Sequence, residues 1–488
     1  MRISLVAIVI AWLTSGGALY SRQPNIVFLL ADDLGYGDLA CYGHPVIKSP
    51  NLDRLAKQGV RLTDCYAASP NCSPARTGIL TGRSPYRVGM YDFARFRPLH
   101  IPEGELTIAE VLRDAGYETM FAGKWHCSGD FKNQPGPGDH GFQHWFAHPK
   151  NFGHNPAGFV RNGADLPKQQ GWMSEIVVNE AMNFIAERDK SKPFMAMLWF
   201  SEPHMPVVAA EEFIEPYRGG EIRKAAEGIK YGGPQVRHNP DEKNRATYYG
   251  IVSMLDHHIG RLLERLKAFG LEDNTIVIFT SDNGPEHRPK TSFGTPGDLR
   301  GAKGHMHEGG YRVPGIIRWP GKIKAGTASA EPVNGTDFLP SLAAAAYATP
   351  TYPKKLDGAN VFPALIGSQS VERETPMMWW LWHARGSKEV SMRIGSYKML
   401  ANMLPQQEVS NNDARQPQGM SIMDFIKKSK LGNFTMYNLG EDISETVELS
   451  TREPQRYESM KRRMIELHAE IRSEGPVYDL RSGKRKNK

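Results

Sequence analysis

Four short polar stretches of this 488-residue chain carry side chains that could bind a metal ion or move a proton. Each follows an apolar run of the kind that forms a strand buried on both faces. The polar residues are Asp32 with Asp33, Lys124 with His126, His204, and Asp282 with Asn283, and the apolar runs before them cover residues 25–30, 118–122, 194–200 and 275–280. Because ligands of open α/β sheets bind beyond the carboxyl ends of the strands, we expect these side chains to meet at one sheet edge.

Two of these stretches supply only oxygen ligands. The oxygen-bearing side chains are those of Asp32, Asp33, Asp282 and Asn283, with no cysteine or histidine among them. Such a set suits a hard cation, calcium first and magnesium second, over zinc or copper. A single Asp-Asp pair after a strand is as often a loop or a helix cap. Two pairs after two apolar strands favour the metal interpretation, and we expect one calcium ion.

Cys72 precedes a good helix-start signal. The dipeptide Ser73-Pro74 predicts a helix through Leu80, with Ser73 as the N-cap and Pro74 as the first helical residue. A helix N-terminus favours negative charge, so one interpretation of Cys72 is a thiolate nucleophile of lowered pKa. The other is a small buried hydrophobic side chain, the usual fate of a free cysteine. The spacing alone does not separate the two.

The composition fits a large globular enzyme. With 40% hydrophobic residues, the chain can bury a core of one big domain or two unequal ones. A net charge of +7 would help attract an anionic substrate but is too diffuse for nucleic-acid binding. The four cysteines are too few for a disulfide scaffold, although a Cys41–Cys65 bridge is one candidate. No Cys-x-x-Cys pair suggests zinc.

The first 22 residues predict a signal peptide. Arg2 forms the charged region, residues 5–13 the apolar region, and residues 15–18 supply small side chains for cleavage. The apolar run is too short for a comfortable membrane span, and no later segment reaches the required length. We therefore expect an exported protein, secreted or periplasmic, with no membrane span after signal removal.

The pattern of elements predicts an α/β fold with a large, mostly parallel central sheet between layers of helices. The clearest helices cover residues 52–58, 107–115 and 246–269, and each is followed by a glycine at the position that tolerates a left-handed conformation: Gly59, Gly116 and Gly270.

A polar, proline-containing stretch over residues 352–375 predicts a domain boundary. Beyond it lie strand-like segments at 377–382, 391–400 and 434–439 and an amphipathic helix at 453–473. We expect a catalytic domain over residues 23–370. Residues 371–488 should form a small α+β subdomain with an antiparallel sheet and one helix.

The segment Cys72-Ser73-Pro74-Ala75-Arg76, followed by Leu80-Thr81-Gly82-Arg83, resembles the signature of the formylglycine-dependent (type I) sulfatases of the alkaline phosphatase-like superfamily. Further blocks resemble that family in the same order along the chain, at residues 25–38, 123–126, 281–285, 299–303, 308–314 and 437–445. One short motif can match by chance, whereas six ordered blocks do not. The layout is most similar to the arylsulfatases and N-acetylgalactosamine-6-sulfatases.

The resemblance implies a nucleophile that is made after translation. In that family a maturation enzyme oxidises the cysteine at the position of Cys72 to formylglycine, whose hydrate attacks the sulfate ester. Carried over residue by residue, the resemblance makes Asp32, Asp33, Asp282 and Asn283 the calcium ligands, with the oxygen of residue 72 completing the shell.

The remaining roles follow in the same way. The resemblance implies that Arg76 and Lys124 hold the hydrated aldehyde and that Lys303 binds the sulfate oxygens. His204 would protonate the leaving alcohol oxygen, and His126 would take a proton from the second hydroxyl and so expel sulfate. Without the resemblance, each lysine would be interpreted as a surface residue and each histidine as a structural one.

Some residues depart from the family pattern or have weaker support. Cys127 stands where the family usually has leucine, and Asn151 is a candidate sulfate contact on a weak alignment. Residues nearby could shape substrate choice: Trp145, His148 and His154. His305 and His307 have no support as catalytic groups and are expected either to line the pocket or to be exposed.

Two other functions are weighed against a carbohydrate sulfatase. Formylglycine-dependent phosphate and phosphonate monoester hydrolases share the superfamily fold, but the block with Lys124 and His126, together with Lys303, resembles the sulfatases more closely. A non-catalytic protein that binds sulfated glycans would leave Cys72 unoxidised. The sulfated carbohydrate substrate itself is implied by resemblance alone.

Overall fold

The computed structural model describes residues 22–94, 99–233, 242–286, 293–386, 388–405 and 421–479. The predicted signal peptide lies outside these residues except for its last position. Among the helices in these ranges, none has the length and apolar character needed to cross a membrane.

Within the described residues, a ten-stranded sheet forms the centre of the molecule. In spatial order its strands are β11 (Thr327–Ser329), β2 (Val60–Leu62), β10 (Gly315–Arg318), β9 (Thr275–Ser281), β1 (Asn25–Asp32), β8 (Phe194–Pro203), β4 (Glu118–Lys124), β5 (His144–His148), β6 (Val160–Arg161) and β7 (Ala164–Asp165). The strands from β9 to β5 pair in parallel, whereas β10 and β6 are antiparallel to both of their neighbours. The predicted mostly parallel sheet is confirmed, with the four predicted strands at its centre.

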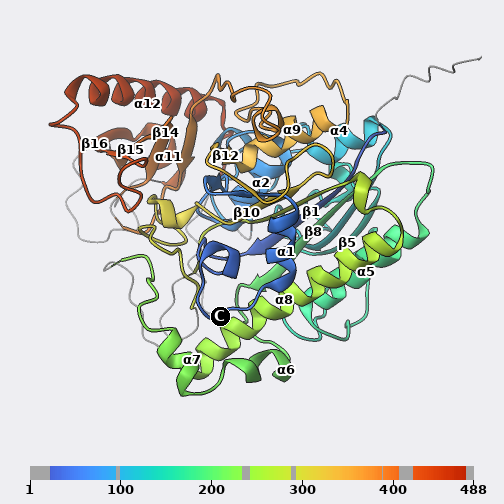
Figure 1. The fold of residues 1–488 in the computed structure, drawn as a ribbon. Helices are drawn as coiled ribbons and strands as arrows, with labels where there is room; N and C mark the ends of the chain where they lie inside the picture. Colours follow the sequence, from blue (N-terminus) through green and yellow to red (C-terminus); the bar gives the residue numbers. More distant parts are fainter. Residues whose placement is uncertain are drawn as a thin grey trace, which may run out of the picture.

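Helices cover both faces of this sheet (Figure 1). One face carries α1 (Pro50–Gln58), α5 (Met173–Glu187) and α8 (Glu242–Ala268), and the other carries α2 (Cys72–Thr81), α4 (Ile108–Asp114) and α9 (Phe338–Ala345). In β1, Val27 and Leu29 pack toward α5 and α8, while Phe28 and Leu30 pack into the opposite core. A strand between two such cores must be apolar throughout, and this explains the continuous apolar run.

Shorter elements complete the main body of the structure. They are β3 (Cys65–Tyr66) paired with β12 (Val333–Asn334), the α-helices α3 (Pro85–Val88), α6 (Glu211–Ile214), α7 (Gly220–Ala225) and α10 (Phe362–Leu365), and the 3-10 turns Ala40–Tyr42, Gly138–His140, Glu215–Tyr217, Glu272–Asn274, Glu308–Gly310 and Gly335–Asp337.

The predicted start of the helix after Cys72 is wrong by two residues. Cys72 is itself the first helical residue, and Asn71, with an extended backbone, is the N-cap. The Ser73 hydroxyl accepts a hydrogen bond from the Ala94 amide at 3.0 Å, so it caps nothing in its own helix. Pro74 stays within the first turn, where its missing amide proton is no loss.

The three glycines that follow the predicted helices have different structural roles. Gly116 and Gly270 adopt the expected left-handed conformation, at φ 92° and 66°. Gly59 does not, since its φ is −140°. A Cβ at Gly59 would lie 2.2 Å from the carbonyl oxygen of Ile317, so the close approach of β10 excludes a side chain there.

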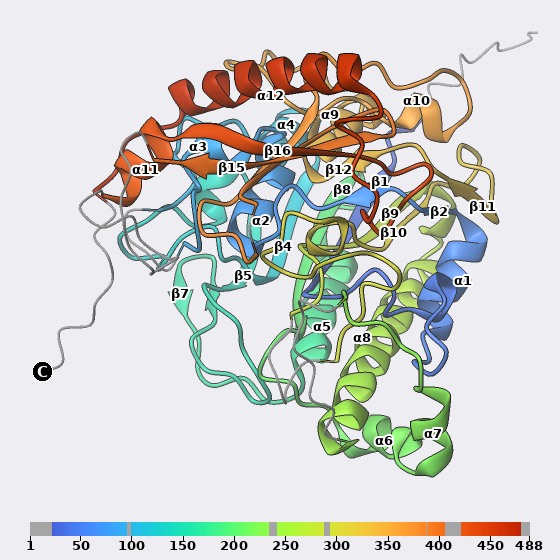
Figure 2. The same ribbon diagram turned by 90° about the vertical axis from the view of Figure 1, so that its left-hand side faces the viewer.

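Beyond residue 376 the described chain forms a four-stranded antiparallel sheet in the order β13 (Met377–Trp380), β14 (Val390–Ile394), β15 (Tyr397–Leu404) and β16 (Lys430–Asn438). The segment predicted as one strand over 391–400 is two strands, because Gly395 at φ 57° turns the chain between them. Helix α12 (Pro454–Glu474) packs on β15 and β16, as expected (Figure 2). The short helix α11 (Ile422–Lys428) is an addition that the sequence pattern did not reveal.

A buried ion cluster joins this sheet to the main body. The Lys398 ammonium in β15 lies 2.9 Å from Glu308 Oε1 and 2.8 Å from Glu445 Oε1, and all three side chains are fully buried. Glu308 also accepts a hydrogen bond from Tyr66 Oη at 2.6 Å. Burial raises the pKa of Glu445 to about 7, whereas for Glu308 the effect of burial is outweighed by Lys398 and Arg312, which lower its pKa to about 2.

Replacing Lys398 by Met would leave these two carboxylates buried without their shared cation. We expect a loss of about 3–5 kcal/mol in the free energy of unfolding. Without the ammonium, the folded-state pKa of Glu445 rises further above its unfolded value, so protonation favours the folded state and the loss is larger at pH 8 than at pH 5. Urea denaturation at the two pH values measures this.

The matched control is Lys428→Met in α11, where the side chain is 58% exposed beside Asp424. Removing that exposed pair should cost no more than about 0.5 kcal/mol. If Lys398→Met lowers the free energy of unfolding only slightly, or by the same amount at both pH values, the result would contradict the described charge cluster.

Candidate active site

The two acidic stretches meet where β1 and β9 end side by side. Asp32 closes β1, and Asp33 follows it with a left-handed backbone at φ 67°. The Asp33 amide donates to Asp282 Oδ1 at 3.2 Å, and Asn283 Nδ2 donates to Asp33 Oδ1 at 2.7 Å. All four side chains are buried. The convergence expected from the strand ends is therefore confirmed.

Three oxygens of this cluster are buried without a hydrogen-bond partner among the described residues: Asp32 Oδ1, Asp33 Oδ2 and Asn283 Oδ1. Leaving a buried acceptor unsatisfied costs about 1–3 kcal/mol, so this arrangement requires a further group that binds oxygen. Ligand atoms of Asp32, Asp282 and Cys72 also lie within 4.8 Å of one another. The donor set is that of a hard cation, and the residues fit calcium.

Arg76, in the first turns of α2, ties the two acidic stretches together. Its Nη2 lies 3.0 Å from Asp32 Oδ2 and 2.7 Å from Asp282 Oδ2, and its Nη1 donates to the Lys124 carbonyl oxygen at 2.8 Å. The guanidinium lies over the Trp199 ring of β8, at 5.1 Å from the centroid. Since the side chain is fully buried, its charge depends on these partners.

Two lysines complete the charge balance. Lys124, at the end of β4, donates to Asp32 Oδ2, and Lys303 donates to Asp33 Oδ1 at 2.5 Å. Both are buried. Among the described residues, the cluster thus contains three carboxylates and three cationic side chains. A bound divalent cation would make it net positive and so ready to bind an anion.

Burial and the neighbouring charges shift the pKa values of these groups. Burial alone would raise the pKa of Asp32, but Lys124, His204 and Arg76 hold it far below its usual range. For Asp33 the effect of burial dominates and raises the pKa to about 6, despite the attraction of Lys303. Burial opposes the charge of Lys303, yet Asp33 raises its pKa above the usual value.

Cys72 lies at the start of α2 with 1% of its surface exposed. Burial raises the pKa of its thiol to about 11, against the lowering effect of Lys124 and Lys303. The encoded cysteine is therefore a neutral thiol at neutral pH. This weakens the interpretation of Cys72 as a thiolate nucleophile, because the helix N-terminus does not overcome burial.

The two predicted histidines follow β8 and β4. His204 Nε2 lies 3.6 Å from Asp33 Oδ2, and its Nδ1 contacts the Met205 carbonyl oxygen at 2.7 Å and the Asn151 amide. Burial lowers the pKa of His204 to about 4. Asn151, the candidate sulfate contact, is thus placed beside His204.

His126 has a left-handed backbone at φ 53° and stacks on Phe93, with ring centroids 6.1 Å apart. Burial, with Lys124 and Arg76, lowers its pKa well below the usual value. A neutral imidazole is able to accept a proton, so the ring has the protonation state required of a base.

The family model described as Sulfatase matches residues 24–348. The chain belongs to the sulfatase family.

Two relatives illustrate its place among these sulfatases. It is 31% identical over 416 residues to N-acetylgalactosamine-6-sulfatase of Canis lupus familiaris, covering 78% of this chain and 72% of that one. It is 32% identical over 389 residues to arylsulfatase A of Homo sapiens, covering 79% and 76%. This sulfatase is therefore a sulfuric ester hydrolase, and the predicted family is confirmed.

Solved structures share its fold. The crystal structure of Ps i-CgsB in complex with k-i-k-neocarrahexaose matches with a TM-score of 0.73 and 26% identity, covering 92% of this chain and 93% of that one. A phosphonate monoester hydrolase of Agrobacterium radiobacter matches with a TM-score of 0.61 and 18% identity, covering 92% and 96%. The latter shows the common fold alone.

Several other sequence expectations for the sulfatase are settled by the structure. His305 and His307 were expected either to line the pocket or to be exposed; both are buried, which excludes exposure, and His305 Nδ1 contacts the Ala302 carbonyl oxygen at 3.0 Å. All four cysteines lie in the described part of the chain and are unpaired. The candidate Cys41–Cys65 bridge does not form, and Cys65 Sγ instead faces Thr280 Oγ1 at 3.7 Å.

The residues proposed to shape substrate choice lie in or after β5. Trp145 packs against Phe131, His148 contacts the Lys150 carbonyl oxygen at 2.8 Å, and His154 stacks on Trp172 with centroids 4.0 Å apart. These contacts are packing and hydrogen-bonding interactions within the protein. The part of the three residues in substrate choice remains a prediction.

Two polar contacts that the C-terminal part of the sulfatase makes near the site were not expected from the sequence. Arg385 lies 2.6 Å from Glu286, a buried residue just beyond Asn283. His383 lies 3.0 Å from Asp92, next to the residue that stacks on His126. The sequence did contain a signal for these contacts, because His383 and Arg385 follow the apolar 377–382 strand in the way that the site residues follow the central strands.

A calcium ion held by this cluster would satisfy the three unpartnered oxygens and should therefore stabilise the folded protein. At a concentration 100 times the dissociation constant, we expect about 2.7 kcal/mol of added stability. Thermal unfolding of metal-stripped protein with and without Ca²⁺, together with calorimetric titration, measures this.

Asn283→Leu removes one of those oxygens and should weaken calcium binding at least about tenfold, whereas Asn283→Asp keeps an oxygen there and should retain it. If Ca²⁺ changes neither the melting temperature nor the heat of titration, the site is not a calcium site.

Proposed function

We propose that this sulfatase is an exported enzyme that uses calcium and a formylglycine made from Cys72 to hydrolyse sulfate monoesters of a carbohydrate. The observation that carries the proposal is the placement of Cys72 at the start of α2, within reach of buried oxygens and in the field of buried cations. Such a site suits a tetrahedral anion held next to a hard cation.

The carbohydrate substrate is supported by the relatives. One is named for N-acetylgalactosamine-6-sulfate chemistry, and the structural neighbour with 26% identity was solved with a neocarrahexaose. We further propose export through the signal peptide over residues 1–22. We also keep the division into a catalytic domain at 23–370 and a subdomain at 371–488.

The proposed mechanism assigns each group of the cluster one task. Asp32, Asp33, Asp282 and Asn283 would hold the calcium ion, which supplies electrostatic stabilisation of oxygen anions when bound. Arg76 and Lys124 orient the oxygens of residue 72 through contacts that already fix both side chains. Lys303 binds a sulfate oxygen as a compact point charge.

Proton transfer falls to the two histidines. His204 holds the proton that the leaving alcohol oxygen takes up, and its 22% exposed ring is the part of the cluster open to a substrate. An anionic sulfate ester beside it would raise its pKa and favour the protonated form. His126, buried and neutral, accepts a proton at residue 72, and this releases the sulfate for the next cycle.

The maturation of Cys72 has a direct chemical test. Conversion of the thiol to an aldehyde lowers the peptide mass by about 18 Da, because oxygen replaces sulfur and two hydrogens, and intact peptide mass from the native host measures it. We expect Cys72→Ala to reduce sulfate ester hydrolysis at least about 10³-fold. The matched control is Cys127→Leu, another buried cysteine, which should keep activity within about threefold.

An unmodified Cys72 in protein from the native host, with binding of sulfated sugars but no turnover, would instead support the glycan-binding alternative. Turnover of a phenyl phosphate faster than the matched phenyl sulfate would support the phosphorus ester hydrolase. Either result contradicts the proposal.

The role of His204 is tested by varying the leaving group. An alcohol such as a sugar hydroxyl needs a proton to leave, whereas a nitrophenolate does not. His204→Ala should therefore lower kcat/KM by about 10²–10⁴-fold for a sugar sulfate and far less for nitrophenyl sulfate. His126→Ala should lower kcat to the same extent for both substrates, because its proton transfer follows loss of the alcohol. Equal losses for both substrates in His204→Ala would exclude it as the acid.

A further inference from the structure

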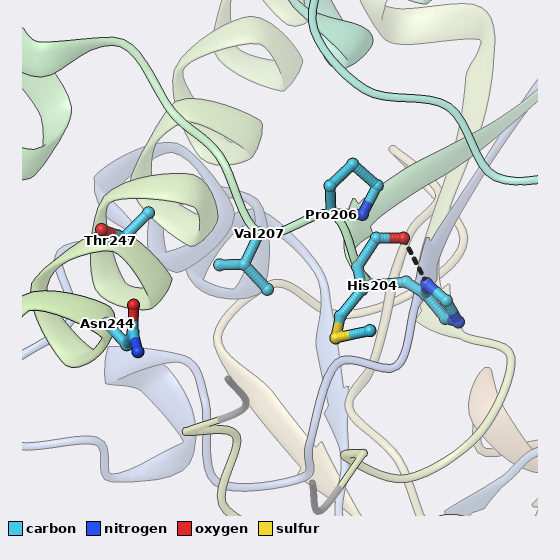
Figure 3. Close-up of a pocket in the computed structure, with 6 residues that line it drawn as sticks. His204, Pro206, Val207, Asn244 and Thr247 are labelled. Atoms are coloured by element: carbon cyan, nitrogen blue, oxygen red, sulfur yellow. Dashed lines mark hydrogen bonds between the residues drawn. The ribbon is translucent and has the colours of Figure 1, made fainter. Parts of the chain in front are cut away.

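Lys303, the residue proposed to bind sulfate, lies in a loop that is held by distant segments. The proposed acid His204, by contrast, follows β8 directly, and its ring contacts the carbonyl oxygen of the next residue (Figure 3). The Lys303 amide donates to the Pro285 carbonyl oxygen at 3.0 Å, and the Gly304 amide donates to the Pro70 carbonyl oxygen at 2.9 Å. These contacts join the loop to the second acidic stretch and to the segment before the proposed nucleophile.

Arg385, from the segment after β13, also contacts this loop. Its amide donates to the Gly304 carbonyl oxygen at 2.7 Å. Its side chain lies along Gly304, since a Cβ at that glycine would be 3.2 Å from both Cγ and Cδ of the arginine. The guanidinium then reaches Glu286, with Nη1 2.6 Å from Oε1 and Nη2 3.3 Å from Oε2. The backbone and the side chain of Arg385 are thus both fixed beside the residue that follows Lys303.

The two members of this ion pair differ in burial. The Glu286 side chain is 8% exposed, whereas that of Arg385 is 42% exposed. Glu286 is also close enough to affect the site residues. Burial raises the pKa of Asp33 and Lys303 lowers it, with Glu286 adding to the rise. Burial lowers the pKa of Lys303, whereas Asp33 and Glu286 raise it. The charge of Glu286 therefore acts at the position proposed for the sulfate.

The ion pair matters for the charge balance of the site. Within the described part of the chain, the cluster at the strand ends has three carboxylates and three cationic side chains, and Glu286 is a fourth carboxylate beside it. A buried negative charge there repels an incoming sulfate, because charges are weakly screened inside a protein. Arg385 places a positive charge at ion-pair distance from Glu286 and so opposes that repulsion.

We propose that Arg385 is a positioning residue for the sulfate site, which offsets the charge of Glu286 and so keeps the surroundings of Lys303 positive enough to bind sulfate. The inference rests on the proposed function, because that function assigns Lys303 to the sulfate oxygens. It gives the C-terminal part of the chain a direct effect on anion binding. Calcium binding does not depend on Arg385, because removing a nearby positive charge favours a bound cation.

The test uses calcium-loaded protein with inorganic sulfate as the probe, because sulfate binding requires no turnover. Arg385→Met removes the charge and should weaken sulfate binding at least about tenfold in calorimetric titration. It should raise KM for a sulfate ester about 5–30-fold and change kcat less than about threefold. Calcium affinity should stay the same or increase. Arg385→Lys keeps a cation and should bind sulfate within about threefold of wild type.

A double variant separates charge from structure. Arg385→Met combined with Glu286→Gln removes one charge of each sign, so sulfate affinity should return to within about threefold of wild type. The matched control is Arg161→Met in β6, where the arginine is 47% exposed, makes two contacts with Glu180 and lies four strands from β1. It should change sulfate affinity less than about twofold. Thermal unfolding checks that each variant is folded, and Arg385→Gln replaces Arg385→Met if the latter is not.

Several results would overturn the role of Arg385. These are unchanged sulfate affinity in Arg385→Met, a loss that the double variant does not restore, or no sulfate binding by the calcium-loaded wild type. An effect on sulfated sugars alone, with inorganic sulfate unaffected, would also overturn it and make Arg385 a direct contact of the sugar. Absence of turnover on every sulfate ester, with sulfate binding intact, would instead overturn only the proposed function.

Discussion

The burial of three carboxylates at the ends of two neighbouring strands is the constraint on which the rest of this structure depends. Asp32, Asp33 and Asp282 are almost completely removed from water. Their charges are tolerable only because Arg76, Lys124 and Lys303 come from three other segments and contact them directly. The positions of α2, of the end of β4 and of the loop bearing Lys303 all follow from this requirement.

The same constraint extends into the C-terminal sheet. The loop that carries Lys303 continues into Glu308, which is held by Lys398 of β15 and by Tyr66 of β3. The C-terminal part is therefore joined by buried charge to the segment that carries Lys303, the proposed sulfate-binding residue. Arg385, from the same part, adds an ion pair with Glu286 beside the acidic cluster of Asp32, Asp33 and Asp282. The small sheet is in this sense a support for the site.

Much of this site could be predicted from the sequence because the central strands are buried on both faces. Such strands are largely apolar, so the end of each apolar run marks the strand's end, and Asp32, Lys124, His204 and Asp282 lie at those ends or directly after them. Arg76 and Lys303 follow no such strand, and only the family resemblance identified them. The helix-start signal pointed to Cys72 without deciding its role. Strands of two to four residues, such as β3, β10 and β11, are too short for periodicity to reveal. The pairing of Arg385 with Glu286 depends on how two distant segments pack, which no local pattern encodes.

The partners at this site lie far apart in the sequence, and this determines how long residue 72 stays accessible during synthesis. Asp33 and Asp282 are 249 positions apart, and Asp33 and Lys303 are 270 apart. Contacts across such separations form late, since the intervening chain must first be made and then brought back. Residue 72 leaves the ribosome long before Asp282 and Lys303 and becomes enclosed only once these residues have been made and packed. The order of synthesis thus leaves this residue accessible for an interval in which the proposed maturation of Cys72 could take place, and folding ends that interval.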